Sequence, residues 1–246
     1  SNSKFLDDNT SVAELIVNQI EFSNIVLINK IDLVDSDEIE KSKNIIFGLN
    51  SDIEIIPTKF TDVPLDKILN TNLFHVQENE PRWRKLLSGN HDNLMQKDKD
   101  SRDHEDKVKS FVYKRNKPFE KKKFEKFVSS EQKGVIRSKG FIWLIDDMNR
   151  AYNYSQAGKI KEITLGEMFW WVALDQDLWP ASDQFYSFLK NIWNERWGDR
   201  RQELVFIGID MDEKEIVKNL DSCLMNDNDL DEFSEKIERI YYQFPD

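Results

Sequence analysis

The chain has little of several residue types that build common sites. Cys223 is the only cysteine in 246 residues, which excludes an internal disulfide and a metal site made of cysteines from this chain alone. No apolar run approaches the roughly 18 residues that a membrane span needs, and no charged, apolar, small-residue leader opens the chain. We therefore expect a cytoplasmic protein with no membrane partner.

Histidine is equally scarce, and its three copies fall in or next to one polar stretch. His91 and His104 lie with Asp103 and Glu105 in a mixed-charge segment that predicts a flexible linker over residues 75–106. These four side chains are a weak candidate for collecting a metal, but their spacing is wide and nothing fixes their geometry. Solvated linker histidines are the favoured interpretation, so we expect no metal ligands in this chain.

Basic residues are outnumbered, 35 to 46, which gives a formal net charge of −11. The imbalance is mostly C-terminal, because residues 210–238 hold eleven Asp or Glu against three Lys, an excess of 11 − 3 = 8. An acidic face repels phosphate backbones and argues against a nucleic-acid partner. For most of these carboxylates the simpler interpretation is a solvated helix face.

What the chain does have is one informative stretch near its start. The apolar residues 25–28 run directly into Asn29, Lys30, Ile31 and Asp32. Such a run is typical of a strand covered on both faces in a parallel α/β sheet, where ligand-binding residues follow the carboxyl end of the strand. The sequence therefore predicts a binding turn at residues 29–32.

The residue types in this turn suit guanine, which offers N1–H and an exocyclic amine on one edge. The Asp32 carboxylate can accept both hydrogen bonds, the Lys30 stem can lie over the base, and Asn29 can brace the neighbouring loop. Adenine would leave the carboxylate unpaired, at a cost of roughly 1–3 kcal/mol. The alternative is a chance Asn-Lys-x-Asp after a core strand, which the strand context disfavours.

Residues 1–74 otherwise show a βαβ rhythm. We expect a helix over 11–21, a helix with Ser36 as N-cap that ends near 49–50, a strand over 53–56 stopped by Pro57, and a short helix over 65–69. Residues 58–60 then fall where a second base-contacting loop would lie, an interpretation that rests on position alone.

Residues 107–246 predict the order β-α-β-β-β-α-β-α, a ferredoxin-like split βαβ with an extra strand and C-terminal helices. The first helix is expected to open at Pro118, and Asp212 to cap a later one. The expected strands and helices are 108–112, 118–128, 134–144, 151–156, 160–164, 183–195, 203–208, 212–220 and 227–241.

Several strings together resemble the CobW-type family of P-loop GTPases, which includes metal chaperones and activators linked to cobalamin synthesis. They are residues 19–33, 61–66, 135–143, 154–158, 198–208 and 220–224, and they extend over nearly the whole chain. The resemblance implies part of a Rossmann-like P-loop G domain (1–74), the linker (75–106) and a ferredoxin-like CobW C-terminal domain (107–246). It also implies GTP and zinc, or another divalent metal, in the intact protein, and delivery of metal to a client metalloprotein.

The chain departs from that family at the phosphate site. It has no Gly-x-x-x-x-Gly-Lys-Ser/Thr loop, no acidic magnesium-side segment and no Cys-x-Cys-Cys motif. It looks like the C-terminal two-thirds of such a protein, so we expect no catalytic residue in it, no GTP hydrolysis and no tight metal binding by this chain alone. Unpaired strand edges in a truncated G domain would favour a homo-oligomer.

Two functions remain open from the sequence. In the first, Asn29, Lys30 and Asp32 select guanine within a GTP-driven metallochaperone whose C-terminal domain faces a client. In the second, the turn is a relic and the ferredoxin-like sheet is a stand-alone protein-interaction module.

Two side questions concern the same C-terminal sheet. Arg137, Lys139, Arg200 and Arg201 suggest an anion site, although pairing with Asp199 and Glu203 is favoured. Most of the tryptophans are expected in the core, with one of Trp170 and Trp171 exposed if both lie on a strand.

Overall fold

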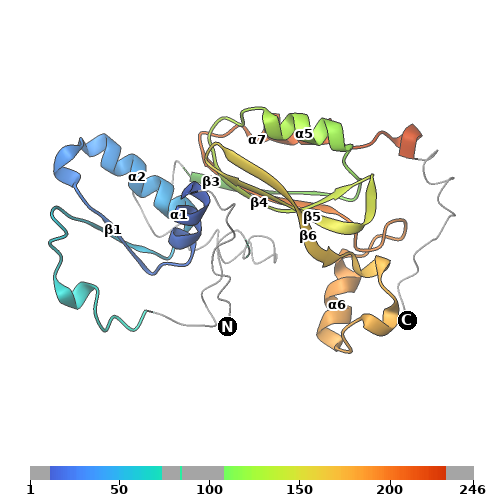
Figure 1. The fold of residues 1–246 in the computed structure, drawn as a ribbon, viewed down its shortest axis with the longest axis horizontal. Helices are drawn as coiled ribbons and strands as arrows, with labels where there is room; N and C mark the ends of the chain where they lie inside the picture. The colour runs from blue at the N-terminus through green and yellow to red at the C-terminus, as the bar shows by residue number, and fades with distance from the viewer. Residues whose placement is uncertain (1–11, 74–83, 85–107, 231–246) are drawn as a thin grey trace.

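Two separate β-sheets organise the molecule. The computed structural model describes residues 12–73, 84 and 108–230, which form a two-stranded parallel sheet and a five-stranded antiparallel sheet (Figure 1). The expected fold class, α/β in the first part and α+β in the second, is confirmed. The predicted linker histidines His91 and His104, and most of the predicted helix 227–241, lie outside the described residues.

The N-terminal sheet has the predicted βαβ order. Helix α1 (Val12–Glu21) precedes β1 (Ile25–Ile28), and α2 (Ser36–Leu49) connects β1 to the parallel strand β2 (Glu54–Pro57). The N-cap of α2 is Asp35, whose side chain accepts from the Glu38 N–H at 2.9 Å, so the predicted cap at Ser36 was one residue late. The helix expected over 65–69 is a single 3-10 turn, η2 (Leu65–Lys67).

Strand β1 is less buried than its apolar sequence predicts. All four of its residues are only half-buried, so the expectation of cover on both faces was wrong for the described structure. Helix α2 lies along one face of the two-stranded sheet in Figure 1. An apolar strand sequence therefore does not by itself determine how deeply the strand is buried, because burial depends on which other elements cover its two faces.

The five-stranded sheet confirms the predicted order of elements. Its spatial order is β3-β7-β4-β5-β6, so β3 and β4 run in the same direction with β7 between them, which is the split βαβ arrangement. The bounds are β3 (Val108–Arg115), α5 (Lys121–Ser129), β4 (Val135–Leu144), β5 (Asp147–Ala157), β6 (Ile160–Phe169), α6 (Asp183–Ile192), β7 (Gln202–Ile209) and α7 (Glu213–Asp221).

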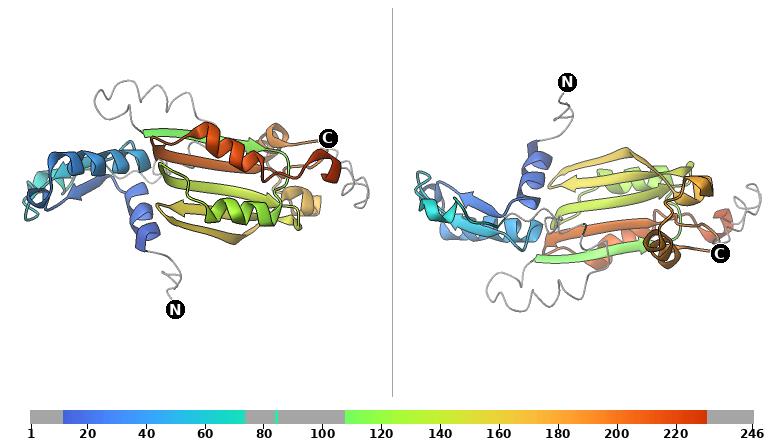
Figure 2. Two further views of the ribbon diagram at one scale, coloured as in Figure 1. Left: turned by 90° about the horizontal axis from the view of Figure 1, so that it is seen from above. Right: turned by 90° about the horizontal axis from the view of Figure 1, so that it is seen from below.

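Helices α5 and α7 lie side by side on one face of this sheet, as the view from above shows (Figure 2). The core beneath them is rich in aromatic rings, and Phe119, Phe124 and Phe206 are fully buried. The helix expected to open at Pro118 begins at Lys121 instead. Phe119 forms isolated backbone bridges with Leu144 and Leu224. This pairing holds Phe119 in an extended conformation, so the helix can begin only after it.

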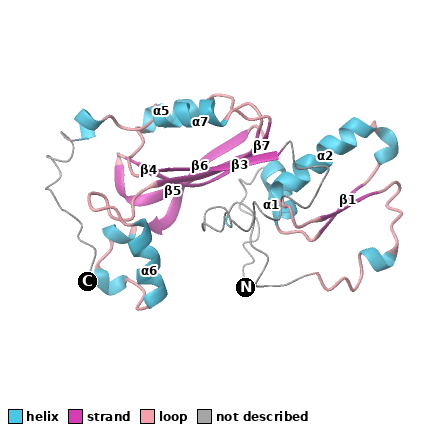
Figure 3. Ribbon diagram, turned by 180° about the vertical axis from the view of Figure 1, so that it is seen from behind, coloured by secondary structure: helices cyan, strands magenta, loops and turns pink. Residues whose placement is uncertain are grey.

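The segment between β6 and β7 contains α6 and the 3-10 turns η3 (Trp171–Ala173) and η4 (Gln176–Leu178). Figure 3 places α6 at the end of the sheet away from α1 and α2. Trp170 is buried and Trp171 half-buried, but both follow β6 rather than lie on it. The prediction that most tryptophans belong to the core is confirmed, since Trp143, Trp170, Trp179 and Trp197 are all buried.

Helices α1 and α2 pack against the end of the five-stranded sheet opposite α6. A Cβ added at Gly48 of α2 would lie 3.0 Å from Val108 Cγ1 and 3.7 Å from Ile207 Cγ2, so the missing side chain allows a close approach. A small apolar cluster joins the same surfaces, and it consists of Val17, Leu49 and Ala157 with Ile20 and Ile136 packed against them. The two sheets are thus connected by side-chain packing.

Candidate functional site

The predicted guanine-binding residues lie in the turn that follows β1. Beyond the strand ends, the Thr58 N–H donates to Ile28 O at 2.9 Å and the Ile31 N–H donates to Thr58 O at 3.3 Å. Lys30 adopts a left-handed conformation with φ 65°, and the chain then enters the 3-10 turn η1 (Ile31–Leu33). The segments after the two parallel strands are therefore held together at the carboxyl edge of the sheet.

Asn29 ties these two segments further. Its Nδ2 donates to Thr61 Oγ1 at 3.1 Å, and its Oδ1 accepts from the Thr61 N–H at 3.0 Å. Both polar atoms of the amide are thus used by one residue, which fixes the orientation of the side chain. The predicted bracing of the neighbouring loop by Asn29 is confirmed, and its partner Thr61 carried no pattern by which the sequence could have identified it.

The loop after β2 holds backbone conformations that L-residues rarely adopt. Phe60 and Thr61 have φ values of 52° and 58°. A bulky aromatic residue and a β-branched residue both lose energy there, and such strain gathers at binding loops. Phe60 is 88% exposed, so no packing within the described chain explains its position.

Asp32 and Lys30 extend from this braced frame. Both residues are exposed, and within residues 12–73, 84 and 108–230 the Asp32 carboxylate has no hydrogen-bond or ion-pair partner. An unpaired carboxylate can accept two hydrogen bonds from one ligand edge, while a lysine stem beside it can cover a ring face. The geometry can therefore serve base recognition, and the nucleotide-binding roles of Asn29, Lys30 and Asp32 stay predictions.

The basic residues considered as an anion site are occupied by the protein itself. Arg201 pairs with Glu203 at 2.6 Å, as the sequence favoured, and Arg200 donates to the carbonyls of Met148 and Trp197. Arg137 is fully buried and pairs with Glu21 of α1 at 2.8 Å. That partner was missed, because a separation of 116 residues leaves no local signal.

Lys139 and Asp199 complete that group. Burial and the neighbouring Arg137 guanidinium lower the pKa of Lys139. The predicted partner Asp199 instead accepts from the backbone N–H groups of Trp171 and Val172, both at 3.0 Å. It anchors the start of the segment between β6 and β7.

Cys223 has the environment of a structural thiol. Its side chain is 2% exposed and Sγ lies 3.2 Å from the carbonyl of Asn219. Burial raises the pKa of the thiol to about 11, which disfavours the thiolate that metals and electrophiles require. In the part of the chain that the structure describes, no three His, Cys, Asp or Glu side chains come close enough to hold a metal ion.

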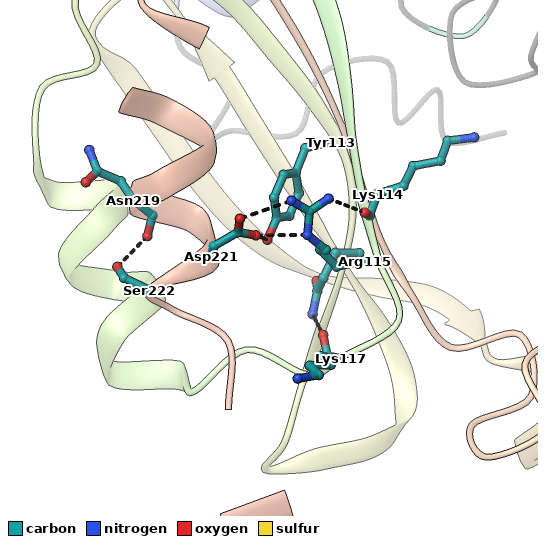
Figure 4. Close-up of polar contacts among 8 residues, drawn as sticks. Tyr113, Lys114, Arg115, Lys117, Asn219, Asp221 and Ser222 are labelled. Carbon is teal, nitrogen blue, oxygen red and sulfur yellow. Dashed lines mark hydrogen bonds and ion pairs between the residues drawn. The ribbon is translucent and has the colours of Figure 1, made fainter. Parts of the chain in front are cut away.

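A second polar cluster fastens α7 to β3 (Figure 4). Both oxygens of Asp221 accept from the Arg115 guanidinium, at 2.9 and 3.0 Å, and Oδ1 also accepts from the Tyr113 hydroxyl at 2.9 Å. Burial and the neighbouring Asp221 raise the pKa of Tyr113. Because each charge is matched inside the cluster, its role is to hold a helix end in place.

Comparison with known proteins places both parts of the chain. Residues 2–57 match the family model described as "CobW/HypB/UreG, nucleotide-binding domain", and residues 108–224 match "Cobalamin synthesis protein cobW C-terminal domain". Among the described helices, none is long and apolar enough to cross a membrane.

A curated relative from Dictyostelium discoideum, "Zinc-regulated GTPase metalloprotein activator 1", is 34% identical over 231 residues. The alignment covers 91% of this chain but 46% of the relative, so the chain spans about half of that protein's length.

Two solved structures are also similar, the Zn(II)-bound YjiA GTPase from E. coli and a Zn(II)-bound triple mutant of YjiA. Each is 16% identical, with a TM-score of 0.35, over 85% of this chain and 54% of the other. The family assignment does not rest on them. It rests on the two family models, which match residues 2–57 and 108–224, and on the Dictyostelium relative: the chain belongs to the CobW-type family of GTPases.

Proposed function

We propose that the chain carries the guanine-recognition half of a GTP-dependent metallochaperone of the CobW type. In this proposal Asp32 accepts from N1–H and the exocyclic amine of guanine, Lys30 covers the base, and Asn29 holds the two loops in register. The five-stranded sheet faces the client metalloprotein or another protein partner. GTP and zinc are substrates of the intact protein, in keeping with the name of the Dictyostelium relative.

One observation supports this proposal above the others. The loops after β1 and β2 are joined by four hydrogen bonds, two through the backbone and two through the Asn29 side chain, while the carboxylate of Asp32 is left exposed. A rigid frame around an unpaired charge is the arrangement that recognises a ligand with little loss of conformational freedom on binding.

The test is a titration of the chain with GMP, AMP and XMP, followed by NMR chemical shifts of residues 25–33 and 58–62. Because this sequence contains no phosphate loop, we expect a dissociation constant on the order of 1 mM for GMP and weaker binding of AMP. Asp32→Ala should remove the preference for GMP over AMP.

Asp32→Asn gives a sharper version of the test. Its amide presents a donor where the carboxylate had an acceptor, which opposes the exocyclic amine of guanine and matches the carbonyl that xanthine has at that position. We expect GMP binding to fall about tenfold and XMP binding to rise. Asp37→Asn is the matched control, because it makes the same chemical change at an exposed residue in the first turn of α2, outside residues 29–32.

Unchanged GMP binding in Asp32→Ala would refute the proposed role of Asp32 in guanine recognition. It would leave the stand-alone interaction module, in which the turn is a relic, as the better account. Zinc is tested by repeating the GMP titration with Zn²⁺ added to the intact protein. The metallochaperone proposal expects the metal to shift nucleotide affinity there, and identical affinities with and without zinc would refute it.

A further inference from the structure

Helix α1 presents a polar stripe to the C-terminal sheet. Glu14, Asn18 and Glu21 follow the i, i+4, i+7 spacing that places side chains on one helix face. Glu21 Oε1 accepts from Arg137 Nε at 2.8 Å, Asn18 Oδ1 accepts from Arg137 Nη2 at 3.3 Å, and Glu14 Oε1 accepts from Ser155 Oγ at 2.9 Å. One helix of the nucleotide part thus reaches both β4 and β5.

The position of Glu21 has no local explanation. It occupies the last turn of α1, where the helix dipole disfavours an anion, and its side chain is only 2% exposed. A carboxylate in such a place requires a buried cation, which Arg137, at 0% side-chain exposure, supplies. The guanidinium also donates from Nη1 to Ser155 Oγ at 3.1 Å and to Gln156 O at 3.3 Å, so it is held firmly in the sheet.

The same helix end leads into the binding turn. Asn50, just after α2, donates from Nδ2 to the carbonyls of Ile20, Glu21 and Ser23 at 3.3, 3.4 and 2.9 Å. Strand β1 begins at Ile25 and ends at Ile28, next to Asn29. Seven residues, 22–28, therefore separate Glu21 from the turn that contains Asp32, and the four that form β1 span roughly 13 Å.

We propose that the Glu21–Arg137 ion pair is a latch that fixes the end of α1 to the CobW C-terminal sheet and so positions the guanine-recognition turn. Glu21 and Arg137 are positioning residues, since neither reaches the ligand. The latch couples the two parts of the chain, so that base binding and the α1–sheet contact strengthen each other. This inference rests on the proposed function for its ligand, and on the structure alone for its geometry.

The test compares Glu21→Gln with Glu203→Gln. As whole residues both glutamates are 5% exposed, and both accept from a guanidinium. Glu203 pairs with Arg201 and also with Lys114 at 2.7 Å, and both of these partners lie within the C-terminal part. The two variants therefore suffer the same chemical change at the same burial. Amide hydrogen exchange of residues 25–32 is measured without nucleotide, and GMP affinity is measured by NMR titration.

We expect Glu21→Gln to speed exchange over residues 25–32 and to weaken GMP binding about fivefold, while Glu203→Gln changes neither. Asn18→Ala, which removes only the 3.3 Å contact to Arg137, should act in the same direction by a smaller factor and serves if Glu21→Gln fails to fold. In the wild type, GMP should slow exchange at Glu21 and Arg137, because coupling is reciprocal.

The outcomes separate this latch from the function on which it rests. If the wild type does not prefer GMP to AMP, the proposed function fails, and exchange over residues 25–32 still decides whether the pair positions the turn. If the wild type prefers GMP but Glu21→Gln and Asn18→Ala behave like Glu203→Gln in either measurement, the latch is overturned and the proposed function stands.

Discussion

Gly140 offers a quantitative test of how closely the strands of the C-terminal sheet approach each other. It lies in β4 opposite Tyr154 of β5 and Leu204 of β7. A Cβ at this position would lie 2.0 Å from Glu203 O and 2.9 Å from Leu204 Cα, and the backbone has φ +155°. Ordinary contact begins at 3.4 Å, so the β7 backbone would have to retreat by 3.4 − 2.0 = 1.4 Å in Gly140→Ala.

Such a shift breaks strand pairing in the centre of a five-stranded sheet, and we expect it to lower the free energy of unfolding by about 3 kcal/mol. Gly158→Ala is the matched control, because Gly158 has φ +58° but no atom within 4 Å of its added Cβ, leaving only backbone strain of about 1 kcal/mol. Thermal unfolding followed by circular dichroism should show Tm losses of roughly 6–12 °C and 2–4 °C. Equal losses in the two variants would refute the close approach.

Two further predictions concern the attachment of α1 and the buried thiol. Asn50→Asp turns a donor to three carbonyls into an anion that faces them, so urea unfolding should show a free energy of unfolding lower by about 2 kcal/mol. The same change at exposed Asn70 should have little effect, and equal losses in the two variants would contradict the role of Asn50 in binding the end of α1. Cys223, with a pKa of about 11, should react with iodoacetamide at pH 8 at least about 100-fold more slowly in the native protein than in urea, and fast native labelling would refute its burial. Because the unfolded thiol ionises first, this group should also make stability fall as pH rises above about 9.

The features that the sequence predicted well are those whose causes lie within a few residues. Asp212 caps α7 by accepting from the Glu215 N–H at 3.0 Å, three residues away, as its spacing indicates. The position of Asn29, Lys30 and Asp32 is equally local, since all three follow one strand, and their nucleotide-binding roles stay predictions. The pairing of Arg201 with Glu203, two residues apart, was within reach for the same reason.

The features that the sequence missed depend on distant parts of the chain. Nothing near Arg137 predicts Glu21 as its partner, because the contact exists only once α1 packs on the sheet. The half-burial of β1 was missed because burial of a strand depends on which elements cover its faces. Pro118 marked a plausible helix start, but pairing of Phe119 with two distant residues delays the helix to Lys121.

The stability of the turn at residues 29–32 depends on the five-stranded sheet, which does not contain it. A two-stranded sheet is marginal by itself, and β1 and β2 have half-buried rather than buried centres. The buried apolar contacts of their helices, Val17 and Leu49 against Ala157, lie on the C-terminal sheet, and Gly48 removes the side chain that would keep α2 from Val108.

The two parts of the chain therefore stabilise each other. The C-terminal sheet covers helices that the small parallel sheet cannot bury alone, and α1 neutralises an arginine that the C-terminal sheet cannot leave unpaired. In this arrangement α1 cannot leave the sheet without exposing Arg137, and a change where β4 and β5 meet α1 would disturb β1. A partner that binds where β4 and β5 meet α1 would consequently act, through packing and charge, on the turn at residues 29–32 and, in the proposed function, on guanine recognition.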